Sequence, residues 1–469
     1  MPAPAGRAKL EGLLGDALSE AAMRAGRTVV SVTVPFACED PVATVFASRR
    51  AGEPFFCWEQ PDRDLRIAAL GRIDEVSSSG SDRFVRVAAD CAHLSGDAVV
   101  RGEGDFTTGP VWTGGFAFND DRAEVNSPSG NAWSSFEPAS MILPELSIQA
   151  SPEGTFVTVN LIGGPAADRS ALTNAALSRV AGLIHRELPM IDPHPAVVPS
   201  IESVRSPEDY ERSVAEAVAR IRSGEIEKVV LAREVMVRAG SAHDPAAIFG
   251  ALRIGFPSCF NFCVGTGEAA FIGASPELLV RCSGRGVATV GLAGATRRSS
   301  DPAVDDHLAQ QLLSSSKDRG EQEVVVRRIV KSLSRISVWV EAADEPEIIK
   351  VANIQHLGTP VYAQLAQPRT AIELAGLLHP TPAVGGEPWK RARQVMAEVE
   401  EMDRGWYAGP VGWMDGSGDG EFCVALRSAL IRDREAHLFA GVGVVADSDP
   451  AAELAETEIK LGALLPLLS

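Results

Sequence analysis

The chain has 469 residues, of which 45% are hydrophobic and 23% are charged, and its formal net charge is −18 at pH 7. This composition is typical of a folded globular protein, and the length predicts either two packed lobes or one large layered domain. A nucleic-acid partner is excluded, because phosphate backbones bind basic surfaces and the sequence has no cluster of lysine and arginine. An anionic ligand would therefore need a few local cations or a metal ion.

Cysteine usage and the lack of long apolar segments predict a cytoplasmic protein. The seven cysteines are scattered without a close CxxC pair, which is typical of reduced and mostly buried thiols. No run of about 18 apolar residues occurs, and the first residues lack the apolar core of a secretory signal. We therefore expect no membrane partner.

The first half of the chain is predicted to form β-sheet, because short β-rich runs alternate with Gly, Asp and Ser turns. The predicted strands cover residues 29–34, 54–58, 65–70 and 155–161. A helix is expected over 168–187, and the proline-rich segment 189–199 is the best candidate boundary. We therefore divide the chain into an amino-terminal β-rich half, residues 1–190, and a second region, residues 200–469.

Helices and strands alternate in the second region. Ser206 and Pro207 predict the start of a helix that ends at Gly224. The strand after it, 226–237, has a period of two that puts Lys228 on the same face as apolar residues. Further strands are predicted at 271–280, 291–298 and 439–445. Further helices end near 317 and cover 318–333, and Asp449 with Pro450 predicts the start of a last helix that reaches about 465.

Three groups of charged residues are candidates for chemistry, and the first lies on the last helix. Glu453, Glu456 and Lys460 share one face, and two carboxylates one turn apart can bind a hard cation such as Mg²⁺. The spacing alone favours a simpler interpretation, in which the glutamates complement the helix dipole and Glu456 pairs with Lys460.

The second group consists of charged residues on apolar faces. Glu321 precedes Val325 and Ile329 on the stripe that should face the core, so its carboxylate needs a cation or a hydrogen-bond partner. Arg328 at the helix edge is the simpler partner. Lys228 either extends along its strand to solvent or is a desolvated base.

The third candidate is Glu277, which follows Pro276 where a strand is interrupted. Its side chain either enters a cleft as a general acid or is a charged edge residue. Dinucleotide binding and zinc are disfavoured. Gly441 and Gly443 lack the third glycine of a dinucleotide motif, and the histidines have no zinc-ligand spacing.

Ten sequence blocks follow one another between residues 206 and 465: EKVVLAR, FIGASPELL, LAGATRR, SKDRGEQEVVV, IQHLGTPV, LHPTPAVGG, DRGWYAGPVGW, FCVALRSAL, AGVGVV and AETEIKL. This ordered series resembles the chorismate-utilising enzymes, which include anthranilate synthase component I, aminodeoxychorismate synthase, salicylate synthase and isochorismate synthase. The amino-terminal strands, with FFCWEQP and WTGGFAFND, also look like the family's more variable front half. The resemblance implies an α+β fold, a large layered α/β sandwich with mostly antiparallel sheets flanked by helices.

The resemblance also implies roles for individual residues. Lys228 matches the lysine that activates water, and Glu277 matches the acid that protonates the departing hydroxyl. The carboxylates around a Mg²⁺ ion that holds the ring carboxylate match Glu321, Glu453 and Glu456. The groups that contact the substrate match Gly294, Ala295, His356, Tyr407, Arg427, Gly441 and Lys460.

Particular positions favour one branch of this family. Ammonia-using branches resemble each other in having glutamine where this chain has Lys228, and aminodeoxychorismate synthases have lysine where it has Ala293. LHPTPAVGG looks like isochorismate synthases, and Ala295 replaces a threonine that is usual in the amine-adding and salicylate branches. Two departures remain, since Gln322 stands where histidine is common and Val442 where a small residue is common.

The resemblance therefore implies an isomerase, an isochorismate synthase that converts chorismate reversibly to isochorismate with Mg²⁺ and serves menaquinone biosynthesis. Alternative functions are a salicylate synthase, an isochorismate synthase of siderophore biosynthesis, a noncatalytic chorismate-binding subunit and an aminase component that serves a glutaminase partner. We expect a monomer without a glutaminase subunit.

Overall fold

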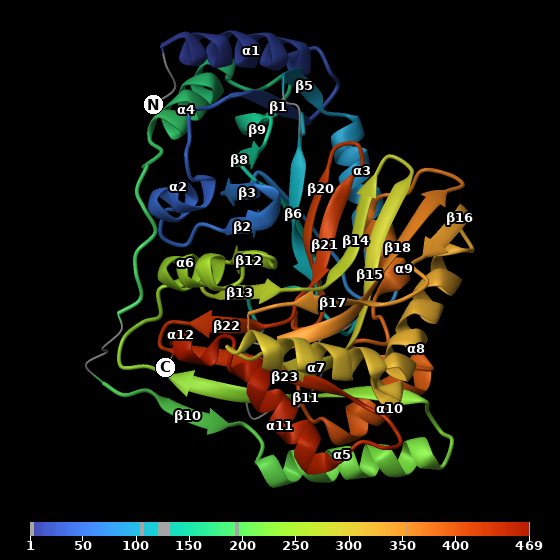
Figure 1. The fold of residues 1–469 in the computed structure, drawn as a ribbon. Coiled ribbons are helices and arrows are strands. Elements are labelled where there is room, and N and C mark those ends of the chain that lie inside the picture. The colour runs from blue at the N-terminus through green and yellow to red at the C-terminus, as the bar shows by residue number, and fades with distance from the viewer. Residues whose placement is uncertain (1–3, 104–106, 121–131, 193–196, 353, 469) are drawn as a thin grey trace.

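The computed structural model describes residues 4–103, 107–120, 132–192, 197–352 and 354–468. These residues form two large sheets with helices around them (Figure 1). The 13-stranded sheet has the order β10 (Ser200–Ser203), β11 (Lys228–Arg238), β23 (Glu435–Val444), β22 (Ser428–Arg432), β13 (Ala270–Ser275), β12 (Phe260–Gly265), β2 (Phe55–Gln60), β3 (Leu65–Leu70), β8 (Leu146–Ser151), β9 (Gly154–Gly163), β1 (Thr28–Pro35) and β5 (Val99–Gly102), and β19 (Gly386–Glu387) pairs with β11.

The second sheet contains 10 strands in the described residues. Its order is β16 (Ser337–Ala342), β18 (Ile354–Leu365), β15 (Gly286–Arg297), β14 (Leu278–Ser283), β21 (Gly420–Val424), β20 (Pro410–Asp415), β6 (Val111–Phe116), β7 (Ala139–Leu143) and β4 (Asp74–Ser77), and β17 (Glu347–Lys350) pairs with β18. Neighbouring strands are antiparallel almost throughout; β1 and β5 are parallel. The predicted α+β class with mostly antiparallel sheets is confirmed.

Helices cover the outer faces and ends of the sheets (Figure 1). They are α1 (Pro4–Ala22), α2 (Pro41–Ser48), α3 (Arg83–Gly96), α4 (Arg169–Ala181), α5 (Pro207–Arg222), α6 (Pro245–Gly255), α7 (Pro302–Ser314), α8 (Ser316–Leu333), α9 (Ala371–Leu378), α10 (Trp389–Val399), α11 (Pro450–Leu461) and α12 (Leu465–Leu468), with a 3-10 turn, η1, at Pro61–Arg63. No helix in the described part of the chain is both long and apolar enough to cross a membrane.

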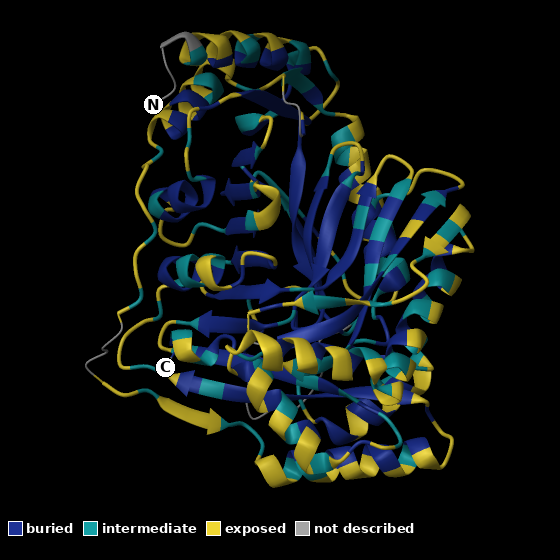
Figure 2. Ribbon diagram, viewed as in Figure 1, coloured by how far each residue is buried: buried dark blue, intermediate teal, exposed yellow. Residues whose placement is uncertain are grey.

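The main hydrophobic core lies between the two sheets. Trp58 and Phe262 from the larger sheet and Trp112 and Phe422 from the smaller one are fully buried in one cluster. Because successive side chains of a strand point to opposite faces, the outer face of the larger sheet must also be covered. Helices α2 and α6 cover one part of it and α1 and α4 another. Figure 2 shows buried and exposed residues alternating along α1, α4 and α6, whereas α2 is buried almost throughout.

Helix starts agree with the capping residues in the sequence. The Ser206 side chain accepts a hydrogen bond from the Asp209 amide at the start of α5. The Asp449 side chain accepts one from the Ala452 amide at the start of α11. The start of α4 after Asp168 is also as predicted. The predicted end of α4 at residue 187 is wrong, because the helix is capped at Gly182. Helix α1 was not predicted.

The interrupted strand at 271–280 is two strands in different sheets. Strand β13 ends at Ser275 in the larger sheet, and β14 begins at Leu278 in the smaller sheet. The chain therefore crosses from one sheet to the other at Pro276 and Glu277. This crossing brings residues of both sheets to one place.

Both halves of the sequence contribute strands to both sheets. Strand β2 pairs with β12 in the larger sheet, and β6 pairs with β20 in the smaller one. The boundary at 189–199 therefore separates two stretches of sequence but not two lobes. Candidate residues of the second region, such as Lys228 on β11 and Glu277 at the crossing, therefore come from both sheets.

Candidate active site

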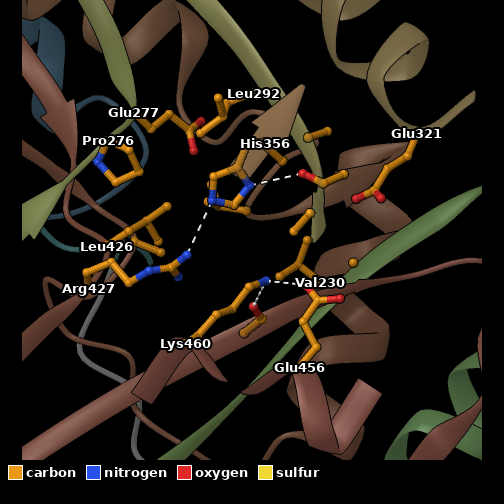
Figure 3. Close-up of a pocket in the computed structure, with 18 of the residues that line it drawn as sticks. Val230, Pro276, Glu277, Leu292, Glu321, His356, Leu426, Arg427, Glu456 and Lys460 are labelled. Atoms are coloured by element: carbon orange, nitrogen blue, oxygen red, sulfur yellow. Dashed lines mark hydrogen bonds and ion pairs between the residues drawn. The ribbon is translucent and has the colours of Figure 1, made fainter. Parts of the chain in front are cut away.

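One pocket gathers side chains from the strands β11, β15, β18 and β23 and the helices α8 and α11. In Figure 3, Glu277, His356, Arg427, Lys460 and Glu321 reach toward a common space from different sides. The residues that line it are Val230, Pro276, Glu277, Leu292, Ala293, Gly294, Ala295, Lys317, Asp318, Glu321, His356, Ala383, Val384, Arg404, Tyr407, Ala408, Leu426, Arg427, Phe439, Gly441, Gly443, Glu453, Glu456 and Lys460.

Glu277 sits at the crossing between the two sheets, where its backbone is held on both sides. Its amide donates a hydrogen bond to the Ser275 hydroxyl at 3.2 Å, and its carbonyl accepts one from the Val424 amide at 3.0 Å. The side chain is buried, and burial raises the pKa of Glu277 to about 8, although the positive charge of Lys228 opposes this rise. The carboxylic acid is therefore protonated at neutral pH and can donate a proton.

The pKa of Glu277 predicts an alkaline limit to any reaction in which this residue is the acid. Below about pH 8 the group is protonated and active, and above it the group ionises, so turnover should fall about tenfold for each pH unit well above the pKa. A turnover profile between about pH 6 and pH 10 measures this. A profile that stays flat across this range would contradict the assignment of Glu277 as the acid.

Lys228 is the first residue of β11, and its side chain does not extend to solvent. It is 1% exposed, and its ammonium nitrogen lies 2.7 Å from the Glu321 carboxylate of α8. A Cβ at Gly443 would overlap the Glu321 carboxylate and lie 2.9 Å from Lys228 Cε, so glycine there makes room for this pair. An ammonium has no lone pair, so Lys228 can act as a base only after it has given up a proton, which the carboxylate of Glu321 opposes.

Gly294, His356 and Arg427 form a hydrogen-bonded chain across the pocket (Figure 3). Gly294 has a φ of 70° at a β-bulge between β15 and β18, and its carbonyl oxygen lies 3.0 Å from His356 Nδ1. Burial lowers the pKa of His356 to about 3, so the ring is neutral. Nδ1 then donates to Gly294, and Nε2 accepts from the Arg427 guanidinium at 3.3 Å.

Arg427 is a buried cation that is 8% exposed, and its backbone φ of 47° lies in the left-handed region. Within the described residues no carboxylate forms an ion pair with it, and its Nε has no hydrogen-bond partner. Buried Arg404, by contrast, pairs with Glu400 at 2.7 Å. A buried guanidinium without a carboxylate is suited to bind a carboxylate that belongs to a ligand.

Tyr407 and Lys460 complete the side of the pocket near Gly441. The Tyr407 ring is stacked on Phe439 with centroids 5.2 Å apart, and burial raises the pKa of Tyr407 to about 12, so its hydroxyl is a donor. Lys460 donates to the Gly441 carbonyl at 2.8 Å. A Cβ at Gly441 would lie 3.1 Å from the Tyr407 hydroxyl, tighter than most contacts, so glycine keeps this side open.

The sequence model of the chorismate binding enzymes matches residues 16–469. The chain belongs to the chorismate binding enzyme family. It is 36% identical over 430 residues to the salicylate biosynthesis isochorismate synthase of Pseudomonas aeruginosa, which covers 92% of this chain and 88% of that protein. It is 32% identical over 428 residues to the isochorismate synthase MenF of Bacillus subtilis, covering 90% and 89%.

A solved structure of the same family has the same architecture. MenF, the menaquinone-specific isochorismate synthase of Escherichia coli, superposes with a TM-score of 0.78 at 26% identity, over 98% of this chain and 100% of that one. The resemblance drawn from the ten sequence blocks is therefore confirmed. This chorismate binding enzyme shares its layered sheets and its enzyme class with these relatives.

The predicted site residues of this chorismate binding enzyme lie together. All of those named from the sequence line the one pocket except Lys228, which contacts it through Glu321. The simpler partner considered for Glu321, Arg328, is wrong, because Lys228 takes that place. The pair between Glu456 and Lys460 does form, at 2.7 Å, and both residues also face the pocket.

Other pocket residues were missed from the sequence. Lys317 and Asp318 belong to the SKDRGEQEVVV block and lie one turn before Glu321, so the helical period could have found them. Gln322, by contrast, faces away from the pocket. Its amide donates to the Gly291 carbonyl at 2.5 Å and to the Thr359 hydroxyl at 3.0 Å, and so holds α8 against the smaller sheet.

The predicted metal ligands have the right donor chemistry for a hard cation. Glu321, Glu453, Glu456 and Asp318 all present carboxylates to the pocket. Burial raises the pKa of Glu453, and the negative charge of Glu456 raises it further. A bound cation would reduce the repulsion between these two carboxylates. In the described residues no three acidic, histidine or cysteine side chains are close enough to hold a metal ion as they stand. The glutamates must therefore turn from their lysine partners to bind one.

Proposed function

We propose that this chorismate binding enzyme is an isochorismate synthase, which converts chorismate reversibly to isochorismate. The observation that carries the proposal is a buried glutamic acid that lines the pocket, with a pKa raised by burial, and a buried lysine that reaches the same pocket beside Glu321. An isomerisation that moves a hydroxyl needs a base for the incoming water and an acid for the departing hydroxyl. Lys228 and Glu277 supply these two functions. The names of the relatives from P. aeruginosa and B. subtilis support the same activity.

Chorismate has two carboxylates, and the pocket offers a different group for each. The unpaired Arg427 guanidinium would bind the enolpyruvyl carboxylate, with the Tyr407 hydroxyl as a second donor. Neutral His356 holds Arg427 in place through Nε2 and is itself fixed by Gly294. The ring would then lie beside Gly294 and Ala295, between the acid and the base.

The ring carboxylate would be bound through Mg²⁺ held by Glu321, Glu453 and Glu456. When bound, this ion neutralises the ring carboxylate and fixes its position in an acidic protein. With the ion bound, Glu321 would turn away from Lys228. Lys228, with no carboxylate partner in a buried position, would then give up a proton to solvent, and the neutral amine could take a proton from water.

In the reaction, Lys228 takes a proton from the water that attacks C2 of the ring. Glu277 gives its proton to the hydroxyl that leaves C4, and the ring double bond moves between the two carbons. Neither oxygen accumulates charge, because each proton transfer accompanies the bond change at its own carbon. The reverse reaction uses the same two groups with exchanged protonation states.

We propose that the product leaves intact for menaquinone biosynthesis. Elimination of pyruvate requires the enolpyruvyl side chain to be held in a reactive geometry, and Ala295, smaller than threonine, confines it less. The similarity to the menaquinone-specific enzyme of E. coli, over 98% of this chain, supports this pathway. The extent of the match does not by itself distinguish the pathways, because the P. aeruginosa relative named for salicylate biosynthesis also matches 92% of this chain.

Water should be the nucleophile even where ammonia is abundant. In ammonium buffer we expect no anthranilate and no amino product, because a site built on Lys228 is arranged to deprotonate water. Mass spectrometry of the products measures this directly. Substantial amino product would contradict the branch assignment and would favour an aminase that takes ammonia from a glutaminase subunit.

A further inference from the structure

Each glutamate of the proposed metal site has a lysine partner. The partners come from three different elements, β11, α8 and α11, and together they neutralise the carboxylates in the absence of a metal ion. The nitrogen-to-oxygen distances are 2.7 Å for Lys228 and Glu321, 3.3 Å for Lys317 and Glu453, and 2.7 Å for Lys460 and Glu456.

Lys317 differs from the other two lysines in its access to solvent. Its side chain is 44% exposed, against 1% for Lys228 and 12% for Lys460. It lies in the first turn of α8 and extends inward to Glu453, whose side chain is only 4% exposed. Lys317 can therefore move into water at little cost, whereas the buried lysines cannot.

We propose that Lys317 is a tethered counter-cation that holds Glu453 in the metal-free enzyme and competes with the divalent cation for it. The inference rests on the proposed function, because it takes Glu453 as a metal ligand. When the cation binds, the Lys317 ammonium moves to solvent and Glu453 turns to the ion. Lys317 thus sets how tightly the enzyme binds its metal, although it contacts neither reacting carbon.

The loss of Lys317 should raise the affinity for the cation. Lys317→Met keeps most of the aliphatic stem but removes the charge, so the buried Glu453 keeps its hydrogen bond with Ser448 but has no cationic partner until a divalent cation arrives. A partly exposed ion pair of this kind is worth less than about 1 kcal/mol, which corresponds to roughly a two- to fivefold decrease in Kd.

The test is a titration of the purified protein with Mn²⁺ in the absence of chorismate, with free Mn²⁺ followed by electron paramagnetic resonance. We expect Lys317→Met to bind Mn²⁺ about two to five times more tightly than the wild type, and Lys317→Arg to bind like the wild type. The matched control is Arg319→Met. Arg319 is two residues after Lys317 and forms an ion pair of 2.7 Å with Glu345 outside the pocket, so this variant removes the same charge from the same helix.

The outcomes separate this inference from the proposed function. If the wild type binds Mn²⁺ and Lys317→Met binds it no more tightly than Arg319→Met does, the counter-cation role is wrong and the metal site stands. If neither the wild type nor Lys317→Met binds Mn²⁺ at millimolar concentrations, the three-glutamate metal site is wrong as well. Weaker binding by Lys317→Met would also overturn the inference.

Discussion

Replacing Lys228 by methionine is expected to lower turnover of chorismate by at least about a hundredfold, the usual scale for loss of a general base. Methionine keeps the length of the stem in a site that is 1% exposed, so the fold should be retained. Glu277→Gln should have an effect of similar size, because an amide cannot protonate the departing hydroxyl. Turnover and circular dichroism, measured on the same samples, check both expectations.

Exposed residues of the same types provide the controls for these variants. Lys331→Met changes a lysine on the exposed side of α8, and Glu268→Gln changes a glutamate in the turn before β13. Both should retain the turnover of the wild type. A folded Lys228→Met protein with near-normal turnover would show that water is activated by another group.

Chelation of divalent cations is expected to abolish activity, and Mg²⁺ is expected to restore it. Without the cation, the ring carboxylate has no counter-charge and Glu321 stays paired with Lys228. The measurement is turnover against free Mg²⁺. Glu453→Gln should shift the curve to higher Mg²⁺, because it removes one ligand charge.

The control for this shift lies on the same helix. Glu458 pairs with Arg233 and is half exposed, so Glu458→Gln should leave the Mg²⁺ requirement unchanged. Full activity in excess chelator would remove the metal from the mechanism. An equal shift for both variants would mean that general charge, and not ligation by Glu453, sets the requirement.

Local signals in the sequence predicted much of the fold. Ser206 and Asp449 identified the starts of α5 and α11, because a capping side chain needs only its own next residues. The interruption of the strand at Pro276 was also predicted, but the sequence did not show that the two parts belong to different sheets. The transfer of the chain from one sheet to the other depends on pairing with strands far away in the sequence, which a local pattern does not contain.

The site was predicted through the family resemblance more than through local pattern. The spacing alone left Glu321, Lys228 and Glu277 with simpler interpretations, because their partners come from distant elements. The pair of Lys228 with Glu321 exists only because α8 packs on β15 and β18 of the smaller sheet and directs Glu321 to the start of β11, beside Gly443. Likewise, Arg427 has no carboxylate partner among the residues that the structure describes, which is a property of three-dimensional packing and has no signature in the sequence.

The most direct test of the proposed reaction is product analysis in water enriched in oxygen-18, with chorismate, Mg²⁺ and the purified enzyme. Chromatography and mass spectrometry at early times should detect isochorismate with one oxygen-18 atom, because the new C2 hydroxyl comes from solvent water that Lys228 deprotonates. Salicylate should be at most a minor product. Formation of salicylate without a lag or accumulation of isochorismate, or isochorismate that carries no oxygen-18, would contradict the account.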